Sequence, residues 1–253
     1  LHGSSAASDV YKRQIFMYEY LHRILGRIIG IIFFIPLLYF TLRKAIPPVL
    51  IPRLYLLLIL GGFQGVLGWY MVKSGLVDDP NVSQYRLTAH LGMAVFIYSL
   101  ILWTVFDLSL NYNHAIRSRI KWMSSTLTLL IFLMILSGGL VAGTRAGIPF
   151  PTWPLMGDTF IPPQIYSMNP SWLSAFEDMA TIQFNHRMFA YLLTILIVIF
   201  AIVLLRSNVP RFLKNGTSAL LFVLSLQVAL GISTLIFYIP IPVAAAHQVG
   251  AIA

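Results

Sequence analysis

Long apolar stretches separated by short polar connections dominate the chain. Six of them reach the length that crosses a membrane, and a seventh begins shortly before the last residue. The six occupy residues 20–42, 54–72, 87–106, 122–141, 184–205 and 217–238, and the seventh begins at residue 242. Each is predicted to be helical, because only helices and closed barrels satisfy the backbone in lipid, and barrel strands alternate over about 10 residues. The pattern predicts an all-α integral membrane protein.

The composition agrees with a membrane protein and excludes several other classes. Of the 253 residues, 58% are hydrophobic and only 10% are charged, which is too apolar for a soluble domain of this length. The formal net charge of +9 does not indicate a nucleic-acid partner, since the basic residues fall in short loops and not along one strip. The absence of cysteine excludes disulfides, thiolate metal sites and cysteine nucleophiles.

The charges of the connections alternate and predict an orientation. Basic residues concentrate in the first, third and fifth connections: Arg43, Lys44, Arg53, Arg117, Arg119, Lys121, Arg206, Arg211 and Lys214. Most acidic residues lie in the other connections: Asp78, Asp79, Asp158, Glu177 and Asp178. The positive-inside rule therefore places the first, third and fifth connections in the cytoplasm. The long connection over residues 142–183, rich in Pro, Trp and Gly, is predicted to form an ordered external cap.

Four histidines lie in segments that all run from outside to inside in this topology: His22, His90, His186 and His247. Each lies near the start of its segment, and an offset of about five residues, at 1.5 Å per residue, would place a ring roughly 7–8 Å below the outer surface. A histidine inside a membrane span is costly and usually marks a metal, proton or substrate site. Four at one depth indicate a functional site near the outer face.

The sequence also repeats itself in order and spacing. EYLHR at residues 19–23 matches QFNHR at 183–187, QGVLG at 64–68 matches QVALG at 227–231, and AH at 89–90 matches AH at 246–247. The offsets are 164, 163 and 157 residues. Two copies of one ancestral bundle explain this pattern. We therefore expect two pseudo-repeated four-helix bundles, the first over residues 15–114 without its first helix and the second over 115–253.

Both ends of the chain are expected to depart from a complete native protein. Ser4–Gln14 (SSAASDVYKRQ) resembles the translation of a sequencing-library adaptor, so residues 1–14 are interpreted as a non-native scar. The last apolar run holds 12 residues, from Pro242 to Ala253, where a span needs roughly 20. The sequence is therefore expected to be a fragment of a longer, eight-span protein, with about seven spans represented.

Paired imidazoles from facing helices are the standard way to hold a b-type haem in a membrane bundle. The pairs His22 with His90 and His186 with His247 therefore predict two haem-sized sites. Nearby arginines are candidates for pairing with haem propionates: Arg23, Arg27 and Arg187. The alternatives are that a membrane histidine donates a hydrogen bond in helix packing and that an arginine near a helix end reaches for the headgroups.

The two halves differ at one chemically important position. Glu19 stands three residues before His22, on the same helix face, whereas the matching residue before His186 is Gln183, which cannot ionise. A carboxylate beside one presumed haem can accept a proton or stabilise a developing cation. The alternative is an interfacial acid favoured by the dipole at a helix N-terminus.

Taken together, these motifs resemble the haem A synthase family of integral membrane enzymes. The resemblance rests on EYLHRILGR (19–27), TAHLGMA (88–94), QFNHRMFAY (183–191), AAAHQVGA (244–251) and GGLVAGTRAGIPFPTWPLMGD (138–158). It covers residues 15–253 and implies eight spans in the complete protein. Without cysteine, the chain resembles the proteobacterial and mitochondrial branch of the family.

The resemblance implies a reaction and a role for each site residue. The family oxidises a methyl group of haem O stepwise to a formyl group, which gives haem A. His186 and His247 are then the axial ligands of a haem b cofactor, and His22 and His90 hold the iron of the substrate haem. Glu19 takes the place of the acidic residue that acts in the oxidation.

The resemblance also implies surroundings and partners. The protein is expected in the lipid bilayer of a bacterial or mitochondrial inner membrane, with its histidines near the outer face. Haem O synthase and cytochrome oxidase assembly factors are candidate partners, as is a second copy of the chain, and the electron-transfer partner is not identified. No nucleic-acid partner is expected.

Two other functions compete with the synthase. A di-haem b-type cytochrome would carry electrons without modifying haem, and it would need the four histidines but no acid beside one pair. A proton or metal transporter would need polar residues through the middle of the membrane. The ionisable groups here stay near the outer ends of the spans, which disfavours the transporter. Glu19 and the long cap favour the synthase over the cytochrome.

Overall fold

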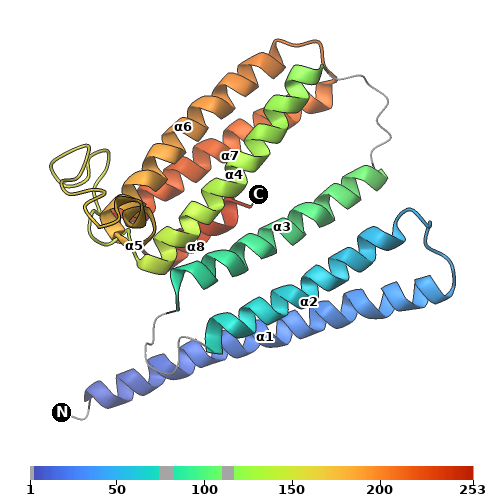
Figure 1. The fold of residues 1–253 in the computed structure, drawn as a ribbon, viewed down its shortest axis with the longest axis horizontal. Helices are drawn as coiled ribbons and strands as arrows, with labels where there is room; N and C mark the ends of the chain where they lie inside the picture. Colours follow the sequence, from blue (N-terminus) through green and yellow to red (C-terminus); the bar gives the residue numbers. More distant parts are fainter. Residues whose placement is uncertain (1–2, 74–81, 110–116, 253) are drawn as a thin grey trace.

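The structure, a computed structural model, describes residues 3–73, 82–109 and 117–252, with side chains described from residue 17 onward. Helices occupy most of this part of the chain (Figure 1). They are α1 (Gly3–Leu42), α2 (Ile51–Lys73), α3 (Gln84–Ser109), α4 (Ser118–Thr144), the 3₁₀ turn η1 (Ser171–Leu173), α5 (Ser174–Glu177), α6 (Met179–Leu205), α7 (Arg211–Ile236) and α8 (Ile241–Gly250). Among the described residues, extended pairing is limited to one isolated bridge between Met156 and Thr159.

Six of the helices are long and apolar enough to cross a membrane, namely α1 from Met17 onward, α2, α3, α4, α6 and α7. They match the six predicted spans, and the predicted all-α membrane fold is confirmed. The predicted end of the sixth span is two residues too late. α7 ends at Ile236 because Tyr238 and Ile239 adopt left-handed backbone conformations ahead of Pro240. A proline disfavours helical geometry in the residue before it, and α8 then starts at Ile241.

The helices pack in chain order. α1 contacts α2, α2 contacts α3, α3 contacts α4, α4 contacts α6, α6 contacts α7 and α7 contacts α8. Figure 1 shows α1, α2 and α3 lying together on one side of the molecule and α4, α6 and α7 on the other. α4 packs against both α3 and α6, so it joins the two groups.

The α3–α4 crossing is close because glycines lie along it. A Cβ atom at Gly139 would stand 2.9 Å from the hydroxyl oxygen of Thr88, and one at Gly143 would stand 2.7 Å from the Cα atom of Gln84. Both distances are shorter than an ordinary carbon contact of about 3.5–4.0 Å, so these positions let the two backbones approach each other.

Some predictions about the limits of the two halves stay open. The predicted boundary at residue 114 lies outside the described residues, as do Asp78 and Asp79. The backbone of residues 3–14 continues the helix of α1. The interpretation of residues 1–14 as a scar stays a prediction.

The connection between α4 and α6 is ordered, as predicted. α4 ends where Arg145 takes a left-handed conformation. Met156 and Ser174 are almost fully buried within the connection, and the Tyr166 amide donates to the hydroxyl of Thr181. We call residues 145–178 the cap. Figure 1 shows it beyond the ends of the helices, at the same end of the molecule as the N-terminus.

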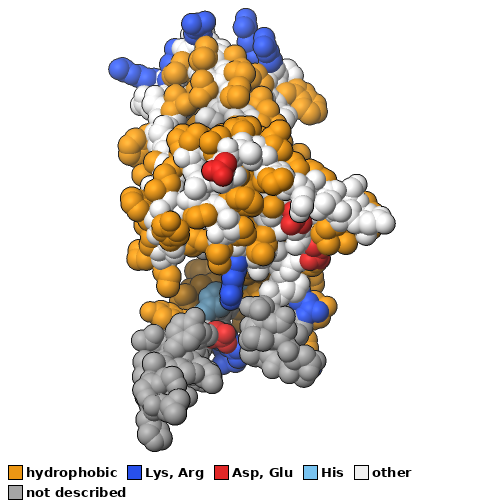
Figure 2. Space-filling view, turned by 90° about the vertical axis from the view of Figure 1, so that its left-hand side faces the viewer, with side chains coloured by type: hydrophobic (Ala, Val, Ile, Leu, Met, Phe, Trp, Pro, Cys, Tyr) orange, Lys and Arg blue, Asp and Glu red, His pale blue; other side chains and the backbone are white. Residues whose placement is uncertain are grey.

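The surface of the helices is apolar, as a lipid environment requires. Large hydrophobic side chains stay exposed along them, including Ile32 (66%), Trp103 (69%) and Phe222 (71%). In Figure 2, orange hydrophobic side chains cover most of the visible surface, and several Lys and Arg side chains gather at the top of the view. Such a surface suits the hydrocarbon core of a bilayer and would be unstable in water.

Candidate functional site

Three of the four predicted histidines lie at matching depths in their helices. His90, His186 and His247 follow the first residues of their helices by six, seven and six residues, whereas His22 lies further along α1, which begins at Gly3. All four helices start at the end of the molecule that carries the cap (Figure 1). We call this the histidine end. The opposite end carries the basic connections and is called the basic end.

The structure brings His22 and His90 together as predicted. Their ring centroids are 6.5 Å apart, with an angle of 80° between the ring planes. With about 2 Å from a metal to each imidazole nitrogen and roughly 1 Å more to the ring centre, two axial imidazoles have centroids about 6 Å apart. The spacing of the pair therefore suits one iron ion between the rings. His22 is exposed and His90 is half-buried.

His186 and His247 are the second predicted pair, and each ring has a hydrogen-bond partner at Nδ1. His186 Nδ1 lies 3.0 Å from the hydroxyl of Ser137 on α4, and His247 Nδ1 donates to the backbone carbonyl of Gln227 at 3.1 Å. The carbonyl partner of His247 requires the proton on Nδ1 and so leaves Nε2 free to bind a metal, whereas the hydroxyl of Ser137 can either donate to or accept from His186.

The residues present fit a haem better than a bare metal ion. Among the described residues, no group of three or more His, Asp or Glu side chains could hold a metal ion. A haem needs only two axial side chains, because its porphyrin supplies the other ligands. Each pair of histidines offers two such side chains from facing helices, and small residues stand against the rings of His186 and His247 at Gly138 and Gly231.

Glu19 and Gln183 occupy matching positions but different surroundings. Glu19 is on the exposed face of α1, and its carboxylate accepts a hydrogen bond from Arg23 at 3.2 Å. Gln183 is only 2% exposed and donates to the carbonyl of Phe150 in the cap at 3.0 Å. The half with the carboxylate is thus open at this position, whereas the half with the amide is covered by the cap.

The three predicted arginines also differ in their surroundings. Arg23 pairs with Glu19, and Arg27 is exposed one turn further along α1. Arg187 is buried and donates to the carbonyls of Phe150 and Leu155 in the cap, at 2.9 and 3.2 Å. Arg187 therefore ties the cap to the helix that carries His186. Pairing of any of the three with propionates stays a prediction.

Comparisons with known proteins agree with this site. The cytochrome oxidase assembly protein family (COX15-CtaA) matches residues 6–253. A heme A synthase of Nitrosospira multiformis is 46% identical over 245 residues, 95% of this chain and 68% of the relative. The chain belongs to the haem A synthase family. Further family members are the heme A synthases of Parvibaculum lavamentivorans, 42% identical over 94% of this chain and 68% of the relative, and of Bradyrhizobium diazoefficiens, 41% identical over 95% and 67%.

In this member of the haem A synthase family, one turn of α4 lies between the two histidine sites. Leu136 and Gly139 contact α3 at Gly92 and Thr88, which stand on either side of His90. Ser137, in the same turn, bonds to His186. The two sites are therefore neighbours separated by a single helix.

Sequence reasoning missed Ser137 as a site residue. A single serine in an apolar segment carries no signal of its own, and its partner is 49 residues away in the chain. Gln64 and Gln227 were visible in the repeat, although not as site residues. Each side-chain amide donates to the backbone carbonyl of a site histidine, His90 and His247 respectively. The repeat was the signal that could have found them.

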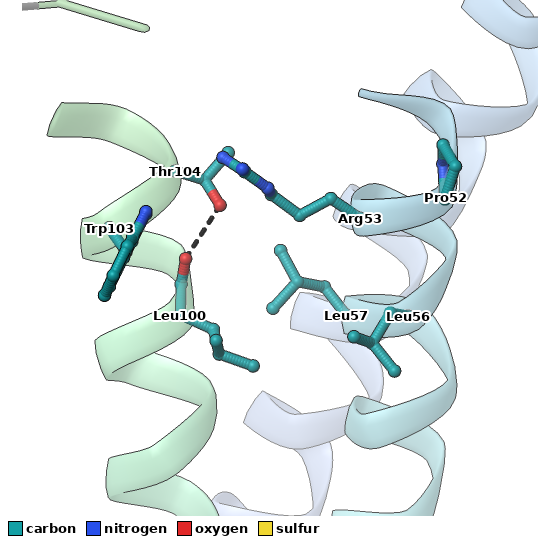
Figure 3. A pocket seen from close by; sticks show the side chains of 7 residues that line it. All are labelled: Pro52, Arg53, Leu56, Leu57, Leu100, Trp103 and Thr104. Atoms are coloured by element: carbon teal, nitrogen blue, oxygen red, sulfur yellow. Dashed lines mark hydrogen bonds between the residues drawn. The ribbon is translucent and has the colours of Figure 1, made fainter. Parts of the chain in front are cut away.

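A groove between α2 and α3 lies apart from the site, toward the basic end (Figure 3). It has a volume of about 450 Å³, and its lining is Pro52, Arg53, Leu56, Leu57, Leu100, Trp103 and Thr104. Arg53 at its edge pairs with Asp107 at 2.8 Å. Leu100 follows His90 by 10 residues, about 15 Å along α3, so the groove is not part of the histidine site.

Proposed function

We propose that this protein is a haem A synthase, which oxidises a methyl group of haem O to a formyl group and so yields haem A. The family and its heme A synthase relatives support the reaction. The observation that carries the proposal is the difference between two matching histidine pairs. One pair has an exposed carboxylate beside it and the other has a buried amide.

His186 and His247 are proposed as the axial ligands of a haem b cofactor. When bound there, haem b supplies one-electron transfer. The carbonyl of Gln227 accepts the Nδ1 proton of His247, which leaves its Nε2 available to the iron, and Ser137 holds Nδ1 of His186. A haem held by these two histidines would serve electron transfer and not oxygen binding. The cap over Gln183 and Arg187 keeps water from the outer edge of this half.

His22 and His90 are proposed to hold the substrate, haem O. Their ring spacing of 6.5 Å suits one iron between them, and His22 is exposed, so a substrate can reach it from the membrane side. Glu19 lies one turn before His22 on the same face. It is proposed to accept a proton, or to stabilise positive charge, as the methyl group is oxidised. Arg23 pairs with this carboxylate at 3.2 Å.

The environment of the reaction is part of the proposal. The chain is an integral membrane protein, and we propose that its basic end faces the cytoplasm and its histidine end the outer side of the inner membrane. Haem O synthase, which would supply the substrate, and cytochrome oxidase assembly factors, which would receive the product, are the proposed partners.

Analysis of the bound haems tests the function directly. The protein is expressed in a host that produces haem O and purified in detergent, and the extracted haems are separated with mass detection. Haem B together with haem A or its hydroxylated precursor is expected. Haem B alone, with haem O available in the host, would instead identify a di-haem cytochrome.

Variants of the ligands separate the two sites in the same assay. His186→Ala and His247→Ala are expected to remove haem B from the purified protein. His22→Ala and His90→Ala are expected to remove haem O and haem A while haem B remains. Loss of all haems in every variant would contradict the assignment of the pairs.

A further inference from the structure

The histidines on α3 and α8 are held by the same local arrangement. The side-chain amide of Gln64 donates to the backbone carbonyl of His90 at 3.0 Å, and that of Gln227 donates to the carbonyl of His247 at 2.7 Å. Each glutamine comes from the preceding helix, α2 or α7. The contact therefore fixes the histidine backbone against its neighbouring helix in both halves.

A glycine four residues after each glutamine makes room for the ring. A Cβ atom at Gly68 would stand 2.9 Å from Cε1 of His90, and one at Gly231 would stand 2.9 Å from Cε1 of His247. Real carbon contacts are about 3.5–4.0 Å, so any side chain there would push the imidazole away. The glutamine and the glycine lie one turn apart on the same helix face.

We infer that Gln64 with Gly68, and Gln227 with Gly231, are positioning residues that set the imidazole orientation of His90 and His247 toward a haem. We call each pair a Gln–Gly clamp. The inference rests on the proposed function, since it concerns the haems of that site. In each clamp, the glutamine fixes the height of the histidine along its helix, and the glycine fixes the plane of the imidazole ring.

The physical reason is that a histidine that would hold a haem must satisfy two conditions together. Its Nε2 atom must point toward the iron, and its ring must keep a single orientation about that direction. In the second clamp the Nδ1 atom of His247 also donates to the carbonyl of Gln227, so one helix turn makes two contacts with the ring and one with the histidine backbone. Supporting contacts of this kind typically change metal affinity by about 10–100-fold when they are removed.

The test is Gly231→Ala, with Gly216→Ala as the matched control on the same helix. A Cβ atom at Gly216 meets nothing within 4 Å, so the control adds the same methyl group without a collision. Each protein is purified with its bound haem, and the haem B content and the electron paramagnetic resonance spectrum of the low-spin iron are measured. That spectrum depends on the angle between the axial ring planes, which a general loss of helix packing does not set.

Gly231→Ala is expected to lower haem B affinity by about tenfold or more, or to shift the low-spin signal, while Gly216→Ala matches the wild type. Gly68→Ala is expected to lower haem O binding and leave the haem B signal unchanged. If Gly231→Ala does not accumulate in the membrane, Gln227→Leu decides. It keeps the side-chain volume but cannot donate to His247, and the same shift is expected.

Wild-type haem content and spectra in both Gly231→Ala and Gln227→Leu would overturn the clamp and leave the proposed function standing. A wild-type protein that binds no haem at all would overturn the proposed function, and the clamp with it. The two failures are therefore distinguished by the wild-type sample alone.

Discussion

At the scale of single residues, the decisive contrast lies between Glu19 and Gln183. The repeat places both one turn before a histidine, yet Glu19 is open and paired with Arg23, whereas Gln183 is enclosed against Phe150. A group that accepts protons needs access to water or to a proton carrier, and Glu19 has that access. A buried amide without charge suits the half that we propose holds the electron-transferring haem b.

We expect Glu19→Gln to lower the rate of haem O oxidation by about 10²–10⁴-fold, because the proton acceptor is lost. Haem content should not change, since the exposed Glu19–Arg23 pair contributes only about 0.2–1 kcal/mol to stability. The measurement is conversion of haem O by the purified variant, with bound haem quantified in the same sample. Normal turnover with normal haem content would exclude the proposed role.

The reverse substitution, Gln183→Glu, serves as the matched control. Its carboxylate would be buried opposite the carbonyl of Phe150, where it could not donate a hydrogen bond in its ionised form. We expect a loss of stability of about 1–3 kcal/mol, measured as a lower melting temperature in detergent. An unchanged melting temperature would show that the cap does not enclose this position.

At the scale of elements, the start of α6 fixes the height of His186. The Asp178 carboxylate accepts hydrogen bonds from the Thr181 amide at 2.8 Å and from the Thr181 hydroxyl at 2.6 Å. Asp178 is thus the N-cap of the helix, and it satisfies an amide that would otherwise lack a partner. Thr181 also receives the Tyr166 amide, so the same turn anchors the cap.

Asp178→Ala is therefore expected to cost about 0.5–2 kcal/mol of stability, through the lost N-cap. The comparison is Asp158→Ala, which removes an exposed carboxylate from the same cap and is expected to change little. Thermal unfolding of the two variants in detergent measures the difference. Equal melting temperatures would contradict the role of Asp178.

Element positions were largely predictable from the sequence, and the span predicted to run beyond the end of its helix did so for a local reason. The six spans follow from apolar length alone, because a helix that crosses lipid needs a long apolar stretch whatever its neighbours are. The end of α7 was placed too late because Phe237 to Ile239 are apolar and continue the pattern. The chain turns there because of Pro240, a signal that hydrophobicity does not carry.

At the scale of the whole molecule, the orientation of the chain in the membrane is a prediction that cysteine labelling can test. The chain contains no cysteine, so single cysteines can be introduced without a background. Ser171→Cys lies in the cap and Ser118→Cys at the basic end, and both positions are exposed. In intact cells, a membrane-impermeant maleimide should label Ser171→Cys at once. It should label Ser118→Cys only after the membrane is permeabilised.

The opposite labelling pattern would invert the topology and place the histidine end in the cytoplasm. Labelling of both positions in intact cells would mean that the chain had not inserted as a spanning bundle. The control is the cysteine-free protein, which should take up no label in either condition.

The repeat in the sequence has a counterpart in the structure, in the contacts around His90 and His247. Matching letters predicted two related halves, and the matching Gln–Gly clamps at His90 and His247 show the same local geometry in both. α4 contacts helices of both groups and contributes Ser137 to the site of His186. Two adjacent sites divided by one helix are thus a result of how the halves join.

The sequence by itself determined the spans and the family, and it predicted a common depth for the four histidines and two related halves. These are properties of spacing along single helices, where a fixed rise per residue converts position into depth. Only the tertiary structure decided that Ser137 meets His186, that Gln183 is enclosed while Glu19 is open, and that Arg187 serves the cap. Such contacts join residues far apart in the chain, and they depend on how the helices rotate and cross, which spacing along one helix does not specify.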